Sequence, residues 1–254
     1  MLFLRSLTFN IAFYLNLILH LLVGLVALVL PRALTVRIVK SWGHTSLWLL
    51  RVICDLKMEL RGREKIPAGG ILVAAKHQSI WETFMLPTLF DDPVFIVKRE
   101  LMWIPVFGWM ASKTRAIPVN RSGGAGAMVA MLKQARQRIE DRRQIVIFPE
   151  GTRRAAGAEP AYKFGVARMY AIIDAACVPV ALNSGIFWPR RTFMRYPGTI
   201  VVDILDPIPP GLDSRAFFDR LQADIESATA RLVAEAKAQS AGIDAAGRAA
   251  SPSP

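Results

Sequence analysis

A histidine and a glutamate lie five residues apart in the stretch "KHQSIWETF", at His77 and Glu82. Histidine exchanges protons near neutral pH, and a carboxylate bound to one ring nitrogen would orient the imidazole, so the pair could act as a general base. The stretch also has a structural explanation. Ser79 and Glu82 fit the S-x-x-E pattern of a capping box, in which both side chains bind free backbone amides at a helix start. Taken alone, the spacing favours the cap, because such boxes are common.

A second stretch, "QIVIFPEGTRR" at 144–154, ends an apolar run abruptly at Pro149. In open α/β sheets, ligands bind beyond the carboxyl ends of the strands. Gly151 permits close approach of the backbone, and the planar guanidinium of Arg153 suits a phosphate. An ordinary strand-to-loop turn with a solvated arginine explains the stretch equally well.

A third stretch, "AIPVNRSGGAGAM" at 116–128, places Arg121 directly before a glycine-rich helix start. Helix N-termini attract anions, so this position could bind a phosphate, although a flexible helix entry explains it at least as well. Ser112 stands where a P-loop has its second glycine, and "LNSGI" lacks the first glycine of a nucleophile elbow. These gaps disfavour a P-loop nucleotide site and a serine hydrolase.

The elements that must position these residues are short β-prone runs that alternate with helical stretches. Strands are expected at 57–60, 71–75, 93–98, 116–119, 144–148, 178–182 and 199–205. Helices are expected around 80–90, 101–113, 125–141, 163–175 and 214–237. Several of the strand runs are continuously apolar, as in strands covered on both faces. The alternation predicts an α/β domain with a mostly parallel or mixed sheet flanked by helices.

The N-terminal part of the chain is strongly apolar, and residues 7–30 contain no Asp, Glu, Lys or Arg. The run is long enough to cross a hydrocarbon layer of ~30 Å as a helix, and longer than the ~7–15 apolar residues usual in a signal peptide. Asn10, Asn16 and His20 favour a helix that lies partly in the interface or packs on protein. Residues 42–56 mix Trp, Leu and Ile with few charges and are expected on the bilayer surface.

The formal net charge of +12 implies an anionic partner or surface. Arg32, Arg37, Lys40 and Arg51 follow the apolar run, which favours a cytoplasmic location for the rest of the chain. No zinc-finger spacing, RNP-like motif or lone basic helix indicates nucleic acid, so anionic lipid headgroups are the simpler explanation. The two cysteines and three histidines show no metal-ligand spacing, so no protein-held metal is expected.

Together these stretches resemble the four sequence blocks of the glycerolipid acyltransferase superfamily, most closely its bacterial 1-acylglycerol-3-phosphate O-acyltransferases. The first block, a histidine followed after four residues by an acid, corresponds to His77 and Glu82. The second resembles "KRELMWIPVFG" at 98–108, which leads to "IPVNR". The third, F-P-E-G-T-R, is present letter for letter at 148–153 and is followed by "YKFG"; the fourth resembles "VPVAL".

The first block departs from the family pattern, because most members have aspartate where this chain has Glu82. The carboxylate therefore stands one methylene further out. Either His77 lies correspondingly further away or the pair is rearranged, and Glu82 could both cap the helix and face His77.

The resemblance implies acyl transfer from a thioester, on coenzyme A or acyl carrier protein, to the free sn-2 hydroxyl of lysophosphatidic acid, which forms phosphatidic acid. It implies His77 as general base and Glu82 as the group that orients it. Lys98, a cation at a strand end, is a candidate for stabilising the oxyanion. The residues implied for the acceptor phosphate are Arg121, Glu150, Gly151, Thr152 and Arg153.

The expected partners are therefore a lysophospholipid, acyl-CoA or acyl carrier protein, and the membrane bilayer, with no nucleic acid and no cofactor. The chain is expected to divide into a membrane-associated helical segment at 1–56, an acyltransferase domain at 57–237 and a disordered tail at 238–254. The catalytic domain is expected on the cytoplasmic face. The alternatives are acylation of glycerol 3-phosphate or a lyso-aminolipid, and a non-catalytic membrane protein that binds lipid.

Overall fold

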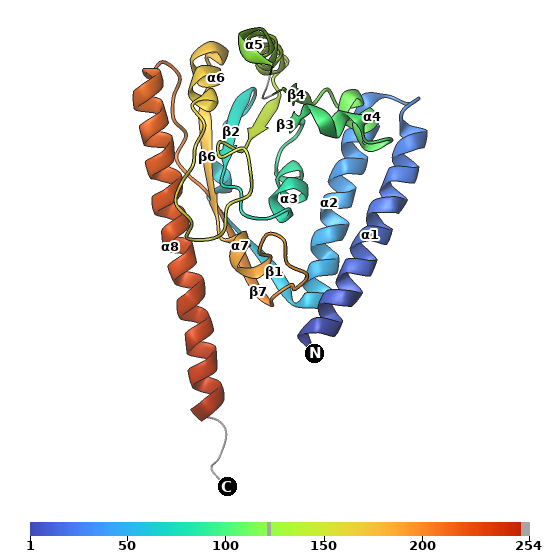
Figure 1. Ribbon diagram of the computed structural model, residues 1–254, viewed down its shortest axis with the longest axis vertical. Coiled ribbons are helices and arrows are strands. Elements are labelled where there is room, and N and C mark those ends of the chain that lie inside the picture. Colours follow the sequence, from blue (N-terminus) through green and yellow to red (C-terminus); the bar gives the residue numbers. More distant parts are fainter. Residues whose placement is uncertain (121–122, 250–254) are drawn as a thin grey trace.

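The computed structural model describes the backbone of residues 1–120 and 123–249, and the side chains of this part up to residue 238 (Figure 1). Its strands form one seven-stranded sheet in the order β1-β7-β6-β2-β5-β3-β4. All neighbours are parallel except β6 and β7. The strands are β1 Leu56–Arg61, β2 Ile71–Ala75, β3 Pro93–Lys98, β4 Ile117–Val119, β5 Gln144–Ile147, β6 Cys177–Leu182 and β7 Gly198–Ile204. The predicted mixed α/β fold is confirmed, and each predicted strand is present with ends that differ by at most a residue or two.

Helices cover both faces of the sheet (Figure 1). They are α1 Leu2–Ala27, α2 Arg32–Cys54, α3 Trp81–Leu89, α4 Phe107–Lys113, α5 Gly124–Glu140, α6 Gly165–Ile173, α7 Ser184–Phe187 and α8 Ser214–Ala249, with short 3₁₀ turns η1 Arg63–Lys65 and η2 Arg99–Trp103. Successive side chains of β2 point to opposite faces of the sheet, as in any pleated strand. Val73 and Ala75 pack in the core beneath α1, α2 and α3, whereas Leu72 and Ala74 pack in the core beneath α5, α6 and α8.

The N-terminal helices α1 and α2 form a hairpin whose polar side chains bind protein groups. The Asn16 side-chain amide donates to Thr45 Oγ1 at 3.0 Å, and a His20 ring nitrogen lies 3.2 Å from Ser41 Oγ. Asn10 Oδ1 accepts from Arg195 Nη2 at 2.9 Å, in the loop before β7. Of the two alternatives predicted from these three polar residues, an interfacial helix or one packed on protein, the structure shows packing on protein.

The stretch expected on the bilayer surface, 42–56, is the second half of the continuous helix α2. This helix packs against α1 and α3, while Trp48 and Val52 remain exposed. Its contact with a bilayer stays a prediction.

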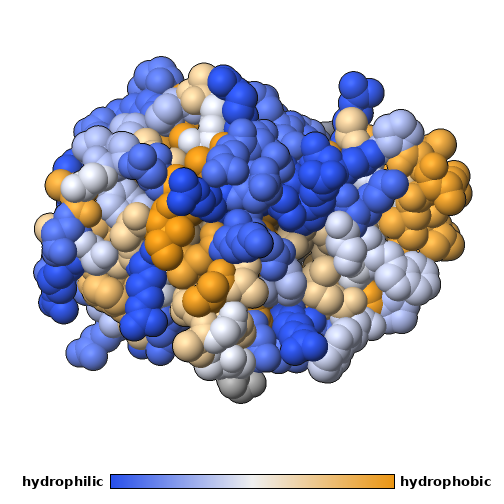
Figure 2. All heavy atoms as spheres, turned by 90° about the horizontal axis from the view of Figure 1, so that it is seen from above, coloured by the Kyte–Doolittle hydropathy of each residue, from blue (hydrophilic) through white to orange (hydrophobic). Residues whose placement is uncertain are grey.

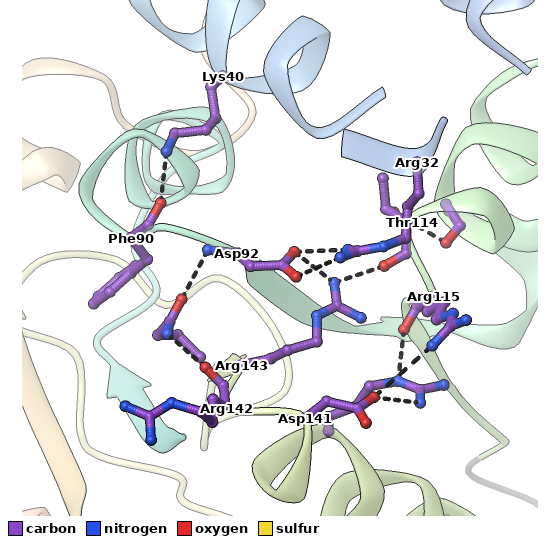
Figure 3. A network of polar contacts seen from close by, with 12 residues as sticks. Arg32, Lys40, Phe90, Asp92, Thr114, Arg115, Asp141, Arg142 and Arg143 are labelled. Carbon is purple, nitrogen blue, oxygen red and sulfur yellow. Dashed lines mark hydrogen bonds and ion pairs between the residues drawn. The ribbon is translucent and has the colours of Figure 1, made fainter. Parts of the chain in front are cut away.

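The hairpin is also joined to the sheet by a cluster of charges around Asp92 (Figure 3). Both terminal nitrogens of Arg32, at the start of α2, donate to the Asp92 carboxylate at 2.8 and 2.6 Å. The buried Arg143 donates to the same carboxylate at 2.9 Å and to the Thr114 carbonyl at 2.8 Å. Burial raises the pKa of Asp92, but hydrogen bonds and charges of Arg32 and Arg143 outweigh it and hold the pKa below its ordinary value. The cluster lies at the amino ends of β3 and β5.

The outer side of α1 is a large apolar surface. Among the described residues, α1 is the one helix long and apolar enough to cross a membrane, and only 22% of its most apolar window is buried. Figure 2 shows apolar side chains gathered on the side of the molecule where α1 lies. Exposed members of this surface include Leu4, Ile11, Leu15, Ile18, Leu19, Leu22 and Val26. An exposed apolar surface of this kind is typical of a site that binds a membrane or another protein.

The C-terminal helix α8 continues to Ala249, past residue 237, where the sequence predicted the helix to end and a disordered tail at 238–254 to begin. The added stretch is rich in alanine, which has the highest helix propensity and so favours a helix without any apolar face to bury. Residues 250–254 lie outside the described residues.

Candidate active site

Three adjacent parallel strands, β2, β5 and β3, bring His77, the loop Pro149–Arg153 and Lys98 to one edge of the sheet. Because carboxyl ends of parallel strands meet at the same edge, the segment after β2 lies beside the segment after β5. The first carries His77 and the second carries the loop Pro149–Arg153. The sheet order thus joins the first and third sequence blocks.

His77 and Glu82 face each other. Nδ1 of His77 lies 3.3 Å from Oε1 of Glu82, whose side chain is fully buried, while that of His77 is 12% exposed. The other carboxylate oxygen of Glu82 accepts a hydrogen bond from the Ser184 hydroxyl at 3.0 Å. With Nδ1–H donating to the carboxylate, Nε2 on the other side of the ring is free to take up a proton.

The capping contacts predicted for the same stretch form in part, although α3 begins one residue later than the S-x-x-E pattern implies, with Ile80 at its N-cap. Oε1 of Glu82 accepts hydrogen bonds from the backbone amides of Gln78 and Ser79 at 2.5 and 2.7 Å. The Ser79 hydroxyl in turn accepts the amide of Trp81, the first residue of α3, at 3.3 Å. One carboxylate therefore binds the amides before α3 and also contacts the imidazole. The additional methylene of glutamate lets the same oxygen reach both sets of donors.

The FPEGTR segment, which begins directly after β5, supplies a stacking partner for the imidazole. The ring of Phe148 lies nearly parallel to that of His77, with centroids 3.9 Å apart and planes inclined by 15°. The backbone is held as well, because the Arg154 amide donates to the His77 carbonyl at 2.8 Å. The third block thus fixes the catalytic candidate of the first.

Glu150, expected at the acceptor phosphate, is buried instead. Its carboxylate binds the equally buried Lys76 at 3.1 Å. Burial raises the pKa of Glu150, and the charge of Lys76 and the backbone amide of His77 oppose that rise. A carboxylate would also repel a phosphate. Glu150 therefore supports the His77 segment from within the protein and does not lie at the exposed rim.

The remaining expected phosphate residues lie at the rim or outside the described part. Gly151 has φ 65°, a left-handed conformation that glycine adopts without strain. Thr152 and Arg153 after it are exposed, and the Arg153 carbonyl accepts Arg190 Nη1 at 2.6 Å. Arg121 lies outside the described residues.

Lys98, the candidate for oxyanion stabilisation, is the exposed last residue of β3. Strand β5 lies between β3 and the strand that precedes His77. Its role in the reaction stays a prediction.

Several residues at the site were missed by the sequence analysis. Lys76 stands next to His77, and Ser184 follows the fourth block within "LNSGI", so both had a local signal in their position. Glu226 on α8, which binds Lys76 at 2.6 Å, had none, because its side chain reaches the site only through the fold. Among the described residues, no group of three or more His, Cys, Asp or Glu side chains could hold a metal ion.

The comparison with protein families decides what this domain is. The family model described as "Acyltransferase" matches residues 57–183, half of the chain. The chain belongs to the acyltransferase family. The resemblance stated from the four sequence blocks is thereby confirmed.

Individual relatives agree with this assignment. The chain is 35% identical over 167 residues to a 1-acyl-sn-glycerol-3-phosphate acyltransferase of Pseudomonas aeruginosa, an alignment that covers 66% of this chain and 65% of the relative. A protein of the same name from Limnanthes alba is 27% identical over 175 residues, with 68% and 62% covered. The chain thus spans slightly less than two thirds of the length of these curated relatives.

A solved structure shares the fold. The crystal structure of the 1-acyl-sn-glycerophosphate (LPA) acyltransferase PlsC from Thermotoga maritima superposes with a TM-score of 0.74 and covers 91% of this chain and 98% of its own. At 21% identity the likeness shows the fold alone.

Proposed function

We propose that this acyltransferase moves an acyl chain from a thioester, on coenzyme A or acyl carrier protein, to the free sn-2 hydroxyl of lysophosphatidic acid, forming phosphatidic acid. The observation that carries the proposal is the contact between His77 Nδ1 and the buried Glu82 carboxylate, 3.3 Å apart, in an acyltransferase domain. The printed names of the relatives, 1-acyl-sn-glycerol-3-phosphate acyltransferases, support the choice of acceptor.

In the proposed reaction, the acceptor hydroxyl oxygen attacks the thioester carbonyl carbon while its proton passes to Nε2 of His77. Glu82 holds Nδ1–H and stabilises the imidazolium that forms. Collapse of the tetrahedral oxyanion breaks the carbon–sulfur bond, and the proton on Nε2 passes to the departing thiolate. The products are the ester and a free thiol. Lys98 is proposed to stabilise the oxyanion.

The acceptor phosphate is proposed to bind at the loop after β5. Arg153 is exposed there and offers a planar fork of donors, and Gly151 lets the backbone approach the phosphate. Thr152 and Arg121 are proposed to add further contacts. Glu150 takes part indirectly, because its carboxylate holds Lys76 behind the loop.

The exposed side of α1 is proposed to bind the bilayer, where lysophospholipid acceptors are available. The net charge of +12 supports attraction to anionic headgroups. The basic residues after α1 favour a catalytic domain on the cytoplasmic face.

A thiol-release assay on the purified protein tests this proposal, with lysophosphatidate, glycerol 3-phosphate and a lyso-aminolipid as acceptors. We expect release with lysophosphatidate above the other acceptors. His77→Ala should lower turnover by roughly 10²–10⁴-fold. His44→Ala is the matched control, because His44 is an exposed histidine on α2, and it should keep parental turnover. Parental turnover in His77→Ala would remove His77 from the mechanism, and preference for another acceptor would overturn the assigned substrate.

A further inference from the structure

Directly behind the catalytic histidine lies a buried cluster made of one lysine, two glutamates and a tyrosine. Lys76 Nζ lies 2.6 Å from Glu226 Oε1 and 3.1 Å from Glu150 Oε1. The Tyr162 hydroxyl donates to Glu226 Oε1 at 2.8 Å, and Lys76 Nζ lies 5.8 Å from the centre of the Tyr162 ring. The side chains of Lys76 and Glu150 are at most 2% exposed, and that of Glu226 is 24% exposed.

The cluster joins three segments that are far apart in the chain. Lys76 follows β2, Glu150 belongs to the loop after β5, and Glu226 lies on α8. Consecutive residues of an extended chain point to opposite faces. Lys76 therefore points to the α8 face, with Leu72 and Ala74, whereas His77 points to the opposite face, toward Glu82. Glu226 is linked to His77 through the backbone at 76–77 and through the loop after β5.

That loop is closed at its base. The Lys163 amide donates to the Pro149 carbonyl at 2.9 Å, which brings the two ends of residues 150–163 together. Glu226 is linked to both ends of the loop. It accepts a hydrogen bond from Tyr162, and it shares Lys76 with Glu150. Burial and the neighbouring carboxylate of Glu226 both raise the pKa of Tyr162, so its hydroxyl stays protonated and remains a donor.

The negative charge of Glu226 helps to set the position of Lys76. The cluster holds one cation between two carboxylates, and the shorter of the two contacts of Lys76 is with Glu226. Hydrogen bonds between ionised groups are about twice as strong as neutral ones. If the charge of Glu226 were removed, Lys76 would be left with Glu150 alone and would be drawn toward the loop. The position of Lys76, and with it the segment that carries His77, depends on the balance between the two carboxylates.

We propose that Glu226 is a positioning residue for the acyl transfer, which sets the His77 segment and the loop 150–163 relative to each other through Lys76 and Tyr162. This inference rests on the proposed function, in which His77 is the base and the loop binds the acceptor phosphate. Glu226 itself touches neither substrate in this mechanism.

Two substitutions of Glu226 separate charge from size. Glu226→Gln keeps the shape and removes the charge, and Glu226→Asp keeps the charge and shortens the side chain. A displacement on the order of 1 Å at a reacting group can lower turnover by about 10²-fold. We expect kcat/KM for the acceptor to fall by roughly 10- to 100-fold in Glu226→Gln and less in Glu226→Asp, with the KM for the acyl donor unchanged within about twofold.

The matched controls are Glu235→Gln and Glu235→Asp. Glu235 lies on the same helix and binds Arg61 at 2.9 Å, away from Lys76, and both variants should keep parental kinetics. The double variant Lys76→Met with Glu226→Gln should lose less than the product of the two single losses, because both residues act through one contact.

Hydrogen exchange read by mass spectrometry gives a second measurement that needs no substrate. Peptides covering 76–82 and 150–163 should exchange faster in Glu226→Gln than in the parent, and no faster in Glu235→Gln. A Glu226→Gln protein with parental exchange in both peptides overturns the inference, as does an order in which Gln retains more activity than Asp. Absence of acyl transfer by the parent would instead refute the proposed function, while the exchange measurement still decides the role of Glu226.

Discussion

Glu82→Gln is the most informative single substitution, because Glu82 combines two roles in one carboxylate. Glutamine keeps a carbonyl oxygen that can accept the amides of Gln78 and Ser79, and glutamine serves in capping boxes. The substitution removes the negative charge that faces His77 Nδ1. It also replaces Oε2 by an amide nitrogen, to which the rotatable Ser184 hydroxyl can turn its lone pair. The cap and the acceptor for His77 Nδ1–H should therefore survive, while the charge that stabilises the imidazolium is lost.

The expected size of the effect follows from these contacts. A hydrogen bond to a charged group contributes about 1.5–3 kcal/mol. Since 1.36 kcal/mol corresponds to a tenfold change in rate, turnover should fall by roughly 10- to 150-fold. The free energy of unfolding should change by less than about 1 kcal/mol, because the capping acceptors are retained.

Glu82→Asp should have the opposite effect, lowering stability while retaining more turnover. Aspartate keeps the charge but is one methylene shorter, so it should lose contact with the capping amides and lower the free energy of unfolding by about 1–2 kcal/mol. It should retain more turnover than the Gln variant. The two variants are compared by thiol release and by thermal unfolding. Parental turnover in Glu82→Gln would refute a role of the Glu82 charge in the reaction.

Two further predictions concern the phosphate loop and the charge cluster at the opposite edge of the sheet. Arg153→Ala should lower kcat/KM for the acceptor by roughly 10- to 150-fold, with little change in the KM for the acyl donor. The control Arg215→Ala, at an exposed arginine, should keep parental kinetics. A rise in the KM for the donor alone would assign Arg153 to the donor. Asp92→Asn should lower the free energy of unfolding by roughly 3 kcal/mol at neutral pH, since the buried Arg143 loses its carboxylate. Because the pKa of Asp92 is lowered in the folded protein, its stabilisation is complete above the unfolded value of 3.8 and is lost as the pH falls through the lowered pKa. Unfolding curves of the two proteins should converge only below about pH 4, and a gap that widened on acidification would contradict this.

The central strands could be predicted because their apolar residues are continuous in the sequence. Runs such as "ILVAA" and "VPVAL" are apolar at every position, and every residue of β2 and β6 is buried in the structure. Such runs fit strands with helices on both faces. The order of the strands could not be predicted in this way, since it depends on pairings between distant segments.

The site was predictable where its parts are close in sequence. His77 and Glu82 stand five residues apart, and FPEGTR is continuous, so each was visible as a pattern. The choice between base and cap was not available from spacing, because both uses place Glu82 at the same position, facing His77 in one and the amide of Ser79 in the other. Glu226 illustrates the opposite case, since it lies on α8 and meets Lys76 only after folding.

The N-terminal helix shows how one apolar run can serve two purposes that its sequence does not separate. Composition alone indicated a helix for the membrane. In the structure, Phe9 and Phe13 on one side of α1 are buried and contact Trp188 at ring distances of 5.4 and 5.8 Å, while the other side of the helix is exposed. The buried guanidinium of Arg195 lies over the Trp188 ring, 4.0 Å from its centre, and donates a hydrogen bond to Asn10 of α1. Because α1 completes the core next to α7 and its Ser184, attachment to a membrane through its outer side would hold the catalytic edge at a fixed orientation relative to the bilayer.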